Sequence, residues 1–208
     1  MRLITLSASY GAGGSVIGPL LAEQLDVPFL DRAVSAALED EVGQSREAAS
    51  TREDVTRSLW RRIFDGFAFV APEGMGELPP PRIEDPDAQL REEAEKRLRR
   101  FAEGGSGVVL GWAGTVVLPE AFRVRLDGPI ERRVVQGMRI EGMDEAATRQ
   151  RLLRSDEIRK VYLKRLYRTD WRNPDLYHLW IDSTVVAPET VVQLISTAAT
   201  AFWARTGS

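Results

Sequence analysis

The sequence contains no cysteine and very little lysine. Without a thiol, the chain has no disulfides, no thiolate nucleophile and no cysteine-ligated metal centre. Only three of its 28 basic residues are lysine, at Lys96, Lys160 and Lys164. Any site built by the first 95 residues therefore depends on arginine, hydroxyl groups and backbone amides to bind negative charge.

The chain also has no long apolar run and no excess of positive charge. Its hydrophobic segments are shorter than the roughly 20 residues that span a bilayer, and its first residues lack a signal-peptide pattern. We therefore expect a cytoplasmic protein with no membrane partner. The net charge of −3 gives no general attraction to nucleic acid. A chain of 208 residues, 43% of them hydrophobic, suits a single domain with a sizeable core.

The first 31 residues predict two successive strand–helix units. The apolar segment Leu3 to Ser7 ends in a glycine loop, Tyr10 to Gly14, and apolar residues from Val16 to Leu25 recur at helical spacing. A second strand over Val27 to Asp31 leads into a helix from residue 32 to about 41, with Asp31 as its cap. Repeated strand–helix units of this kind predict a parallel sheet.

Similar patterns predict the remaining elements. Further strands are expected at 107–111, 122–127 and 178–182. Helices are expected near 51–69 and 87–103, from Pro129 at the first helical position, over 144–167, and from Pro188, again at the first position, to the C-terminus. Between 72 and 81 proline and glycine allow only a loop.

The glycine loop is the clearest candidate binding site. Such a loop points backbone N–H groups and the positive end of a helix at one place, which suits a phosphate group. In the P-loop pattern Gly14 stands at the lysine position, and the magnesium-binding hydroxyl falls on Val16 or, one residue earlier, on Ser15. In the dinucleotide pattern Gly11 and Gly13 fit, but the third glycine is replaced by valine. These residues alone leave open a kinase, a dinucleotide-dependent oxidoreductase, or a turn that only packs a helix on a strand.

Three longer stretches resemble the cytidylate kinase-like family of P-loop proteins. They run from Ile4 to Arg32, from Gly111 to Pro119 and from Tyr162 to Thr184. The resemblance implies an α/β fold of the three-layer P-loop NTPase type, with a parallel sheet, a helical insert and a helical lid. The implied core comprises 1–39, 104–137 and 169–208, the acceptor-binding insert 40–103 and the lid 138–168.

The same resemblance implies an ATP-dependent phosphotransferase that uses ATP and Mg²⁺ and phosphorylates a nucleotide, with CMP favoured, or a related small molecule. It assigns phosphate and ATP binding to Gly11, Ala12, Gly13, Gly14, Ser15, Val16 and Arg133, acceptor binding to Asp31, Arg32 and Trp112, catalysis to Asp156 and Arg159, and a metal contact to Ser15. Arg133 would stack on adenine, and Asp156 and Arg159 would form an ion pair within the lid.

Several positions at which the family carries arginine hold other residues here. Ala8 and Ser15 replace two arginines at the phosphate loop, Trp112 replaces the arginine that clamps the acceptor phosphate, and Leu153 and Glu157 replace two in the lid. Catalysis of phosphoryl transfer depends on neutralising phosphate charge. These replacements therefore allow a second function, a catalytically impaired pseudokinase that acts as a nucleotide-binding or scaffold protein.

The aromatic residues of the predicted 51–69 helix suggest a packing role. They lie in part about one helical turn apart and are expected to form core or homodimer contacts: Trp60, Phe64, Phe67 and Phe69. A homodimer is therefore possible, with the small-molecule nucleotide as the other partner.

Overall fold

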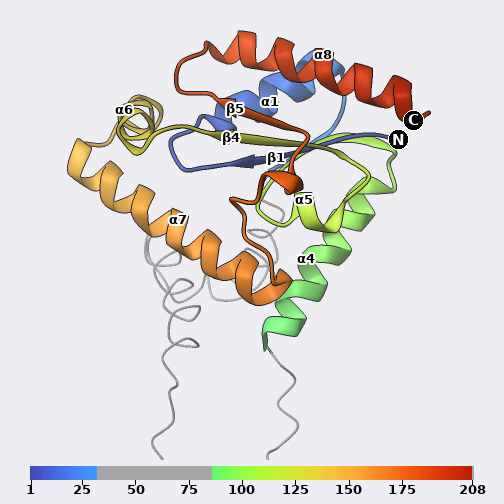
Figure 1. Ribbon diagram of the computed structural model, residues 1–208, viewed down its shortest axis with the longest axis horizontal. Helices are drawn as coiled ribbons and strands as arrows, with labels where there is room; N and C mark the ends of the chain where they lie inside the picture. The colour runs from blue at the N-terminus through green and yellow to red at the C-terminus, as the bar shows by residue number, and fades with distance from the viewer. Residues whose placement is uncertain (32–85, 208) are drawn as a thin grey trace, which may run out of the picture.

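A computed structural model describes residues 1–31 and 86–207, which form a parallel sheet between two layers of helices (Figure 1). The strand order is β2-β3-β1-β4-β5, and each pair of neighbouring strands is parallel. The strands are β1 (Arg2–Ala8), β2 (Phe29–Asp31), β3 (Ser106–Leu110), β4 (Phe122–Asp127) and β5 (Leu179–Asp182). The predicted parallel sheet is confirmed, because each strand starts and ends within two residues of its expected position.

Helices cover both faces of this sheet. α1 (Gly14–Leu25) and α8 (Pro188–Thr206) pack on one face, and α4 (Pro86–Ala102), α5 (Gly114–Val117) and α7 (Glu145–Tyr167) lie on the other (Figure 1). α6 (Ile130–Glu141) lies beyond the carboxyl ends of β1 and β4. This arrangement is the expected three-layer α/β architecture. α4 falls within the predicted insert and α7 within the predicted lid, whose boundaries stay predictions.

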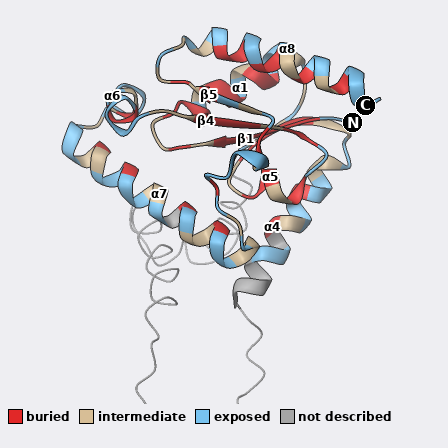
Figure 2. Cartoon of the chain, viewed as in Figure 1, coloured by how far each residue is buried: buried red, intermediate tan, exposed pale blue. Residues whose placement is uncertain are grey.

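The hydrophobic core is divided by the sheet into two parts. Ile4 and Leu6 of β1 pack toward α1 and α8, where Ile195 joins them, whereas Leu3 packs with Leu98 on the α4 side. Successive residues of β1 therefore point into different layers, and the residues on both faces of the strand are buried (Figure 2). A strand covered on both faces reads as a continuous apolar run, which is the pattern that predicted it.

The helix ends agree with the sequence signals, with one shift. Asp144 caps α7 by accepting from the backbone N–H of Ala147 at 2.8 Å, and Pro188 occupies the first position of α8 as predicted. Pro129, predicted at the first position of α6, is instead its N-cap. Its ψ of 144° is extended, so the helical turns begin only at Ile130.

Some expected elements lie outside the described residues, and two short helices were not expected. The helices predicted over 32–41 and 51–69, the loop at 72–81 and the aromatic residues assigned to the 51–69 helix lie outside the described residues. α5 and the 3₁₀ helix η1 (Pro174–Leu176) are too short for a periodic pattern to reveal. Within the described part of the chain, no helix combines the length and apolar character needed to cross a membrane.

α1 approaches the sheet closely because Gly18 has no side chain. A Cβ at this position would lie 2.7 Å from Cε2 of the Phe29 ring. We therefore expect Gly18→Ala to lower the free energy of unfolding by about 1–3 kcal/mol, as overpacked cores do. Chemical denaturation measures this change. Thr197→Ala on the exposed side of α8 is the control and should stay within about 0.5 kcal/mol of the wild type. A Gly18→Ala protein of unchanged stability would contradict this account of the packing.

Candidate functional site

The glycine loop makes a tight turn between β1 and α1. Gly11 and Gly13 have φ values of 76° and 75°, in the left-handed region that glycine adopts readily. Gly13 is the N-cap of α1, and no side chain caps this helix end. The N–H of Val16 donates to the carbonyl of Gly13. The N–H groups of Gly14 and Ser15 can therefore donate hydrogen bonds to a ligand, and the helix dipole favours an anion there.

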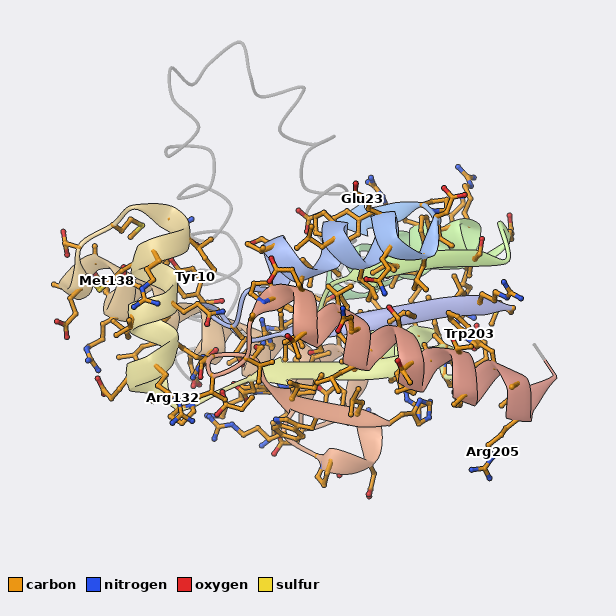
Figure 3. The ribbon with its side chains drawn as sticks, turned by 90° about the horizontal axis from the view of Figure 1, so that it is seen from above. Tyr10, Glu23, Arg132, Met138, Trp203 and Arg205 are labelled. Carbon is orange, nitrogen blue, oxygen red and sulfur yellow. The ribbon has the colours of Figure 1, made fainter. Side chains whose placement is uncertain are left out.

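Side chains from other elements hold the loop in place. Ser183 donates to the carbonyl of Ala12 at 2.7 Å. The side-chain amide of Gln136, in the orientation that satisfies its neighbours, accepts from the N–H of Gly13 and donates to the carbonyl of Ser183, each at 3.3 Å. Tyr10 reaches α6, where its hydroxyl donates to Glu141 at 2.6 Å (Figure 3). The loop is thus attached to both α6 and the segment that follows β5.

The same packing excludes a side chain at the lysine position of the P-loop pattern. A Cβ on Gly14 would lie 2.4 Å from Cβ of Ala8 and 3.1 Å from Cδ1 of Leu110. Gly14 itself is buried, whereas the next residue, Ser15, is exposed and Val16 is half-buried. The missing lysine is therefore a requirement of how α1 sits on the sheet.

Arg133 and Asp156 form an ion pair between α6 and α7. Arg133 is 4% exposed, and its Nη2 donates to Oδ2 of Asp156 at 2.9 Å. Its Nε and Nη1 donate to the carbonyls of Gly128 and Tyr10 at 2.9 and 3.3 Å. The guanidinium, expected to stack on adenine, is thus turned into the protein, and its role in ATP binding stays a prediction.

Arg159 is not the partner of Asp156, which corrects the ion pair expected within the lid. It is 3% exposed and donates from Nη2 to the carbonyl of Ala8. Its Nε and Nη1 have no hydrogen-bond partner among the described residues. Burial, followed by repulsion from Arg125, lowers the pKa of Arg159 to about 9. Such a buried and incompletely satisfied charge is costly unless something pairs with it.

The residues assigned to the acceptor lie along the carboxyl edge of the sheet. Trp112 follows β3, contacts Tyr162 edge-on with ring centroids 5.6 Å apart, and lies 5.4 Å from the guanidinium carbon of Arg159. Asp31 is exposed at the end of β2, paired in register with Leu110 of β3. Arg32 lies outside the described residues. The structure therefore brings Trp112 together with Arg159 and leaves Asp31 on the neighbouring strand.

Sequence reasoning missed Arg125, a charged residue at the centre of the molecule. It is fully buried in β4, donates to the Ser9 hydroxyl at 2.6 Å, and lies with its guanidinium carbon 4.0 Å from the centre of the Trp171 ring. The signal was the alternation of apolar and charged residues along Phe122–Asp127. In an inner strand of a parallel sheet both faces are covered, so charges on one face become buried.

A metal ion at this site would be bound mainly by the phosphates of the substrate and less by side chains of the protein. The described residues contain no group of three or more histidine, aspartate or glutamate side chains able to hold a metal ion. The exposed hydroxyl of Ser15 in the first turn of α1 is the predicted contact for Mg²⁺. This suits an ion that keeps several waters and is bound chiefly through substrate phosphates.

Comparisons with known proteins agree with this architecture. The model of the cytidylate kinase-like family matches residues 3–185. The cytidylate kinase of Ignicoccus hospitalis is 24% identical over 200 residues, which cover 94% of this chain and 97% of that protein.

Two solved structures share the fold. An uncharacterized protein from Eubacterium ventriosum superimposes with a TM-score of 0.63 at 17% identity, over 96% of this chain and 99% of the other. A shikimate kinase from Acinetobacter baumannii, in complex with shikimate, does so with a TM-score of 0.50 at 18% identity, over 97% and 94%. The predicted three-layer P-loop fold is thereby confirmed.

Restoring the lysine of the phosphate loop should damage the protein. Gly14→Lys places a Cβ against Ala8, so we expect a loss of about 1–3 kcal/mol in unfolding free energy from overpacking alone. Ser15→Lys is a matched control, because it adds the same charge one residue later on an exposed position. Both variants share the unfavourable helix-dipole contribution of roughly 0.3–1 kcal/mol. Equal stability of the two variants in urea would show that position 14 has room for a side chain.

Breaking the ion pair between α6 and α7 should be more costly than breaking an exposed one. Asp156→Asn removes the closer of the two carboxylates paired with the buried Arg133, and the other, Asp127, is 3.6 Å away. We therefore expect the unfolding free energy to fall by about 3 kcal/mol. Glu157→Gln, the neighbouring residue in α7, removes an exposed pair with Lys160 and should cost about 1 kcal/mol or less. Chemical denaturation compares the two. Equal losses would mean that the Arg133–Asp156 pair does not behave as a buried one.

Proposed function

The chain belongs to the cytidylate kinase-like family, and from this premise we propose that it transfers a phosphoryl group from ATP to a nucleotide or a related small molecule. The observation that supports the proposal is the meeting of two features at the carboxyl edge of the sheet. One is the N-terminus of α1, which has no side-chain cap. The other is the buried pair of arginines, Arg133 and Arg159, supplied by α6 and α7.

CMP is the acceptor to test first. The matched family and the relative from Ignicoccus hospitalis are both named for cytidylate kinase. In this reaction an oxygen of the ionised CMP phosphate attacks the γ-phosphorus of ATP, the bond to the bridging oxygen breaks, and ADP leaves. Because the attacking oxygen carries no proton, the step needs no general base. Catalysis then depends on position and on neutralisation of charge.

Each residue of the site has a defined part in this proposal. The N–H groups of Gly11, Gly14 and Ser15 bind the phosphates of ATP, as a helix N-terminus preceded by glycines does. The N–H groups of Ala12 and Gly13 donate instead to the Ser9 carbonyl and the Gln136 side chain. Arg159 neutralises charge on the transferred group, and Asp156 holds Arg133 beside the loop. Ser15 would help to hold Mg²⁺, which would supply further charge neutralisation when bound. Trp112 and Asp31 contact the acceptor.

A direct assay of transfer separates this function from its alternatives. The purified protein is incubated with ATP and Mg²⁺ and with CMP, UMP, AMP, GMP or shikimate in turn, and products are resolved by chromatography and phosphorus NMR. Formation of ADP together with one phosphorylated acceptor supports the proposal. Binding of ATP without transfer to any acceptor supports a pseudokinase instead. If no triphosphate stabilises the protein in thermal unfolding, the proposal fails, because ligand at 100 times its dissociation constant should add about 2.7 kcal/mol.

Removal of Arg159 should slow transfer far more than removal of its neighbour. A charge-assisted phosphate contact is worth about 1.5–3 kcal/mol, so Arg159→Ala should reduce kcat by roughly 10- to 150-fold. Lys160→Ala changes an exposed residue whose ion-pair partner, among the residues that the structure describes, is Glu157, and it should leave kcat within about twofold of the wild type. Steady-state kinetics on variants with intact unfolding transitions measure the difference. A folded Arg159→Ala protein of normal kcat would remove Arg159 from the reaction.

A further inference from the structure

Arg125 is a buried charge whose place in the fold the proposed function does not use. On β4, Phe122, Val124 and Leu126 pack toward α1 and α8. Arg125 projects from the opposite face and is 0% exposed. Burying a charge in the middle of a sheet is costly, and sequences tolerate it only where the charge is paired or used.

The partners of Arg125 fix its guanidinium but only partly neutralise it. Nη1 donates to the Ser7 hydroxyl at 3.1 Å and Nη2 to the Ser9 hydroxyl at 2.6 Å. Its carboxylate partner is Asp127, 3.2 Å from Nη2 and 19% exposed. The guanidinium also stacks on Trp171, while Nε has no hydrogen-bond partner in the described part of the chain. These contacts aim the side chain at the segment that leads into the glycine loop.

A second buried guanidinium reaches the same segment. Arg159 donates to the carbonyl of Ala8, between the two serines that hold Arg125. Its guanidinium carbon lies 5.4 Å from the Trp171 ring, on which Arg125 also stacks. The two arginines are close enough that Arg125 lowers the pKa of Arg159, after the larger effect of burial. Two like charges held together without water are stabilised most by an anion that contacts both.

The charges of the whole cluster also favour an anion. It consists of three arginines and two aspartates, and its net charge is therefore +1. The five residues are Arg125, Arg133, Arg159, Asp127 and Asp156. Within the described residues, one carboxylate oxygen of each aspartate accepts no hydrogen bond. The aspartates hold the arginines in position, and the count of charges alone leaves one positive charge for an anion to neutralise.

This cluster lies beside the position at which the P-loop pattern places its lysine. Ala8, whose carbonyl binds Arg159, has its Cβ against Gly14. Arg125 is paired in register with Ser7, one residue earlier on β1. A cation from the neighbouring strand thus reaches Ser9, directly before the loop, while packing leaves no room for a side chain on Gly14.

We propose that Arg125 is a binding residue for a phosphoryl group of the substrate and, together with Arg159, supplies the positive charge that Gly14 cannot. The inference rests on the proposed phosphotransfer function, which names the phosphates to be bound. Both arginines are buried, so binding of the anion requires the groups that cover them to move. Stacking on Trp171 keeps Arg125 in place whether or not an anion is present.

Binding of inorganic tripolyphosphate tests the inference without requiring turnover. This probe has three phosphates, as ATP does, and no base. Its affinity is measured by calorimetry and by tryptophan fluorescence, to which Trp171 contributes. Arg125→Met should raise the dissociation constant by about tenfold or more. Arg123→Met is the matched control, because Arg123 lies two residues earlier on the same strand and donates to the carbonyls of Leu176 and Pro119. It should change the affinity by less than about twofold.

Folding is monitored separately so that a structural role of Arg125 is recognised. Denaturation curves select variants that fold, and only these enter the binding comparison. If Arg125→Met does not fold, Arg125→Lys decides, since it keeps the charge but cannot reach both serines and should bind more weakly. A folded Arg125 variant that binds tripolyphosphate as the wild type does overturns the inference, and so does a wild type that does not bind it.

The inference and the proposed function fail in different ways. Suppose that the protein transfers a phosphoryl group from ATP and that a folded Arg125→Met variant binds tripolyphosphate as well as the wild type does. The proposed function then stands, and Arg125 has no part in it. Binding of tripolyphosphate that depends on Arg125, in a protein that phosphorylates no acceptor, would support the inference and reject the function.

Discussion

The close contact between Gly14 and the end of β1 is the constraint on which the rest of the site depends. α1 can start directly above Ala8 only because position 14 has no side chain. Next to this contact, the left-handed Gly11 and Gly13 give the loop its tight turn, and Gly13 as N-cap leaves the start of α1 without a side-chain cap. The contact also removes the cation that a phosphate loop usually carries at position 14. The loop therefore provides hydrogen-bond donors, and other elements must provide charge.

Those other elements provide it as arginines that are held from several sides. Arg133 comes from α6, Arg159 from α7 and Arg125 from β4, and each is less than 5% exposed. Guanidinium groups suit this arrangement because their planar shape can donate in several directions and stack on an aromatic ring at the same time. A lysine ammonium could not reproduce the contacts of Arg125 with two serines, a carboxylate and Trp171. The scarcity of lysine in the sequence is consistent with such a site.

Most of the fold could be predicted from the sequence, because its strands and longer helices follow from patterns of neighbouring residues. The apolar run of β1, the glycine turn and the helical spacing of α1 are all visible in the first 25 residues. Proline signals placed the start of α8 correctly and that of α6 within one residue. α5 has four residues, which is about one helical turn, so apolar residues cannot recur along it at helical spacing.

The site was predictable only in part, since its contacts join residues far apart in the chain. The family resemblance implied that Asp156 pairs with Arg159 within one helix, whereas Asp156 pairs with Arg133 across 23 positions. Arg125 looked like one of several charges on an alternating strand, and only the sheet order, which places β4 between β1 and β5, explains its burial. The glycines of the loop, by contrast, stand where the sequence placed them, because backbone geometry there is set by the residues themselves.

α6 is attached both to the glycine loop and to α7, so a movement of one of these three parts affects the other two. α6 contacts α7 through ion pairs that include Arg149–Glu131 and Arg151–Glu141, and it contacts the loop through Tyr10 and Gln136. A displacement of α7 that keeps these pairs carries α6 with it, and α6 then pulls on the loop. The position of α7 is thereby coupled to the loop, so a ligand at the loop that displaces α7 would change the affinity of any second ligand that also displaces it, and each would change the other's affinity by the same factor.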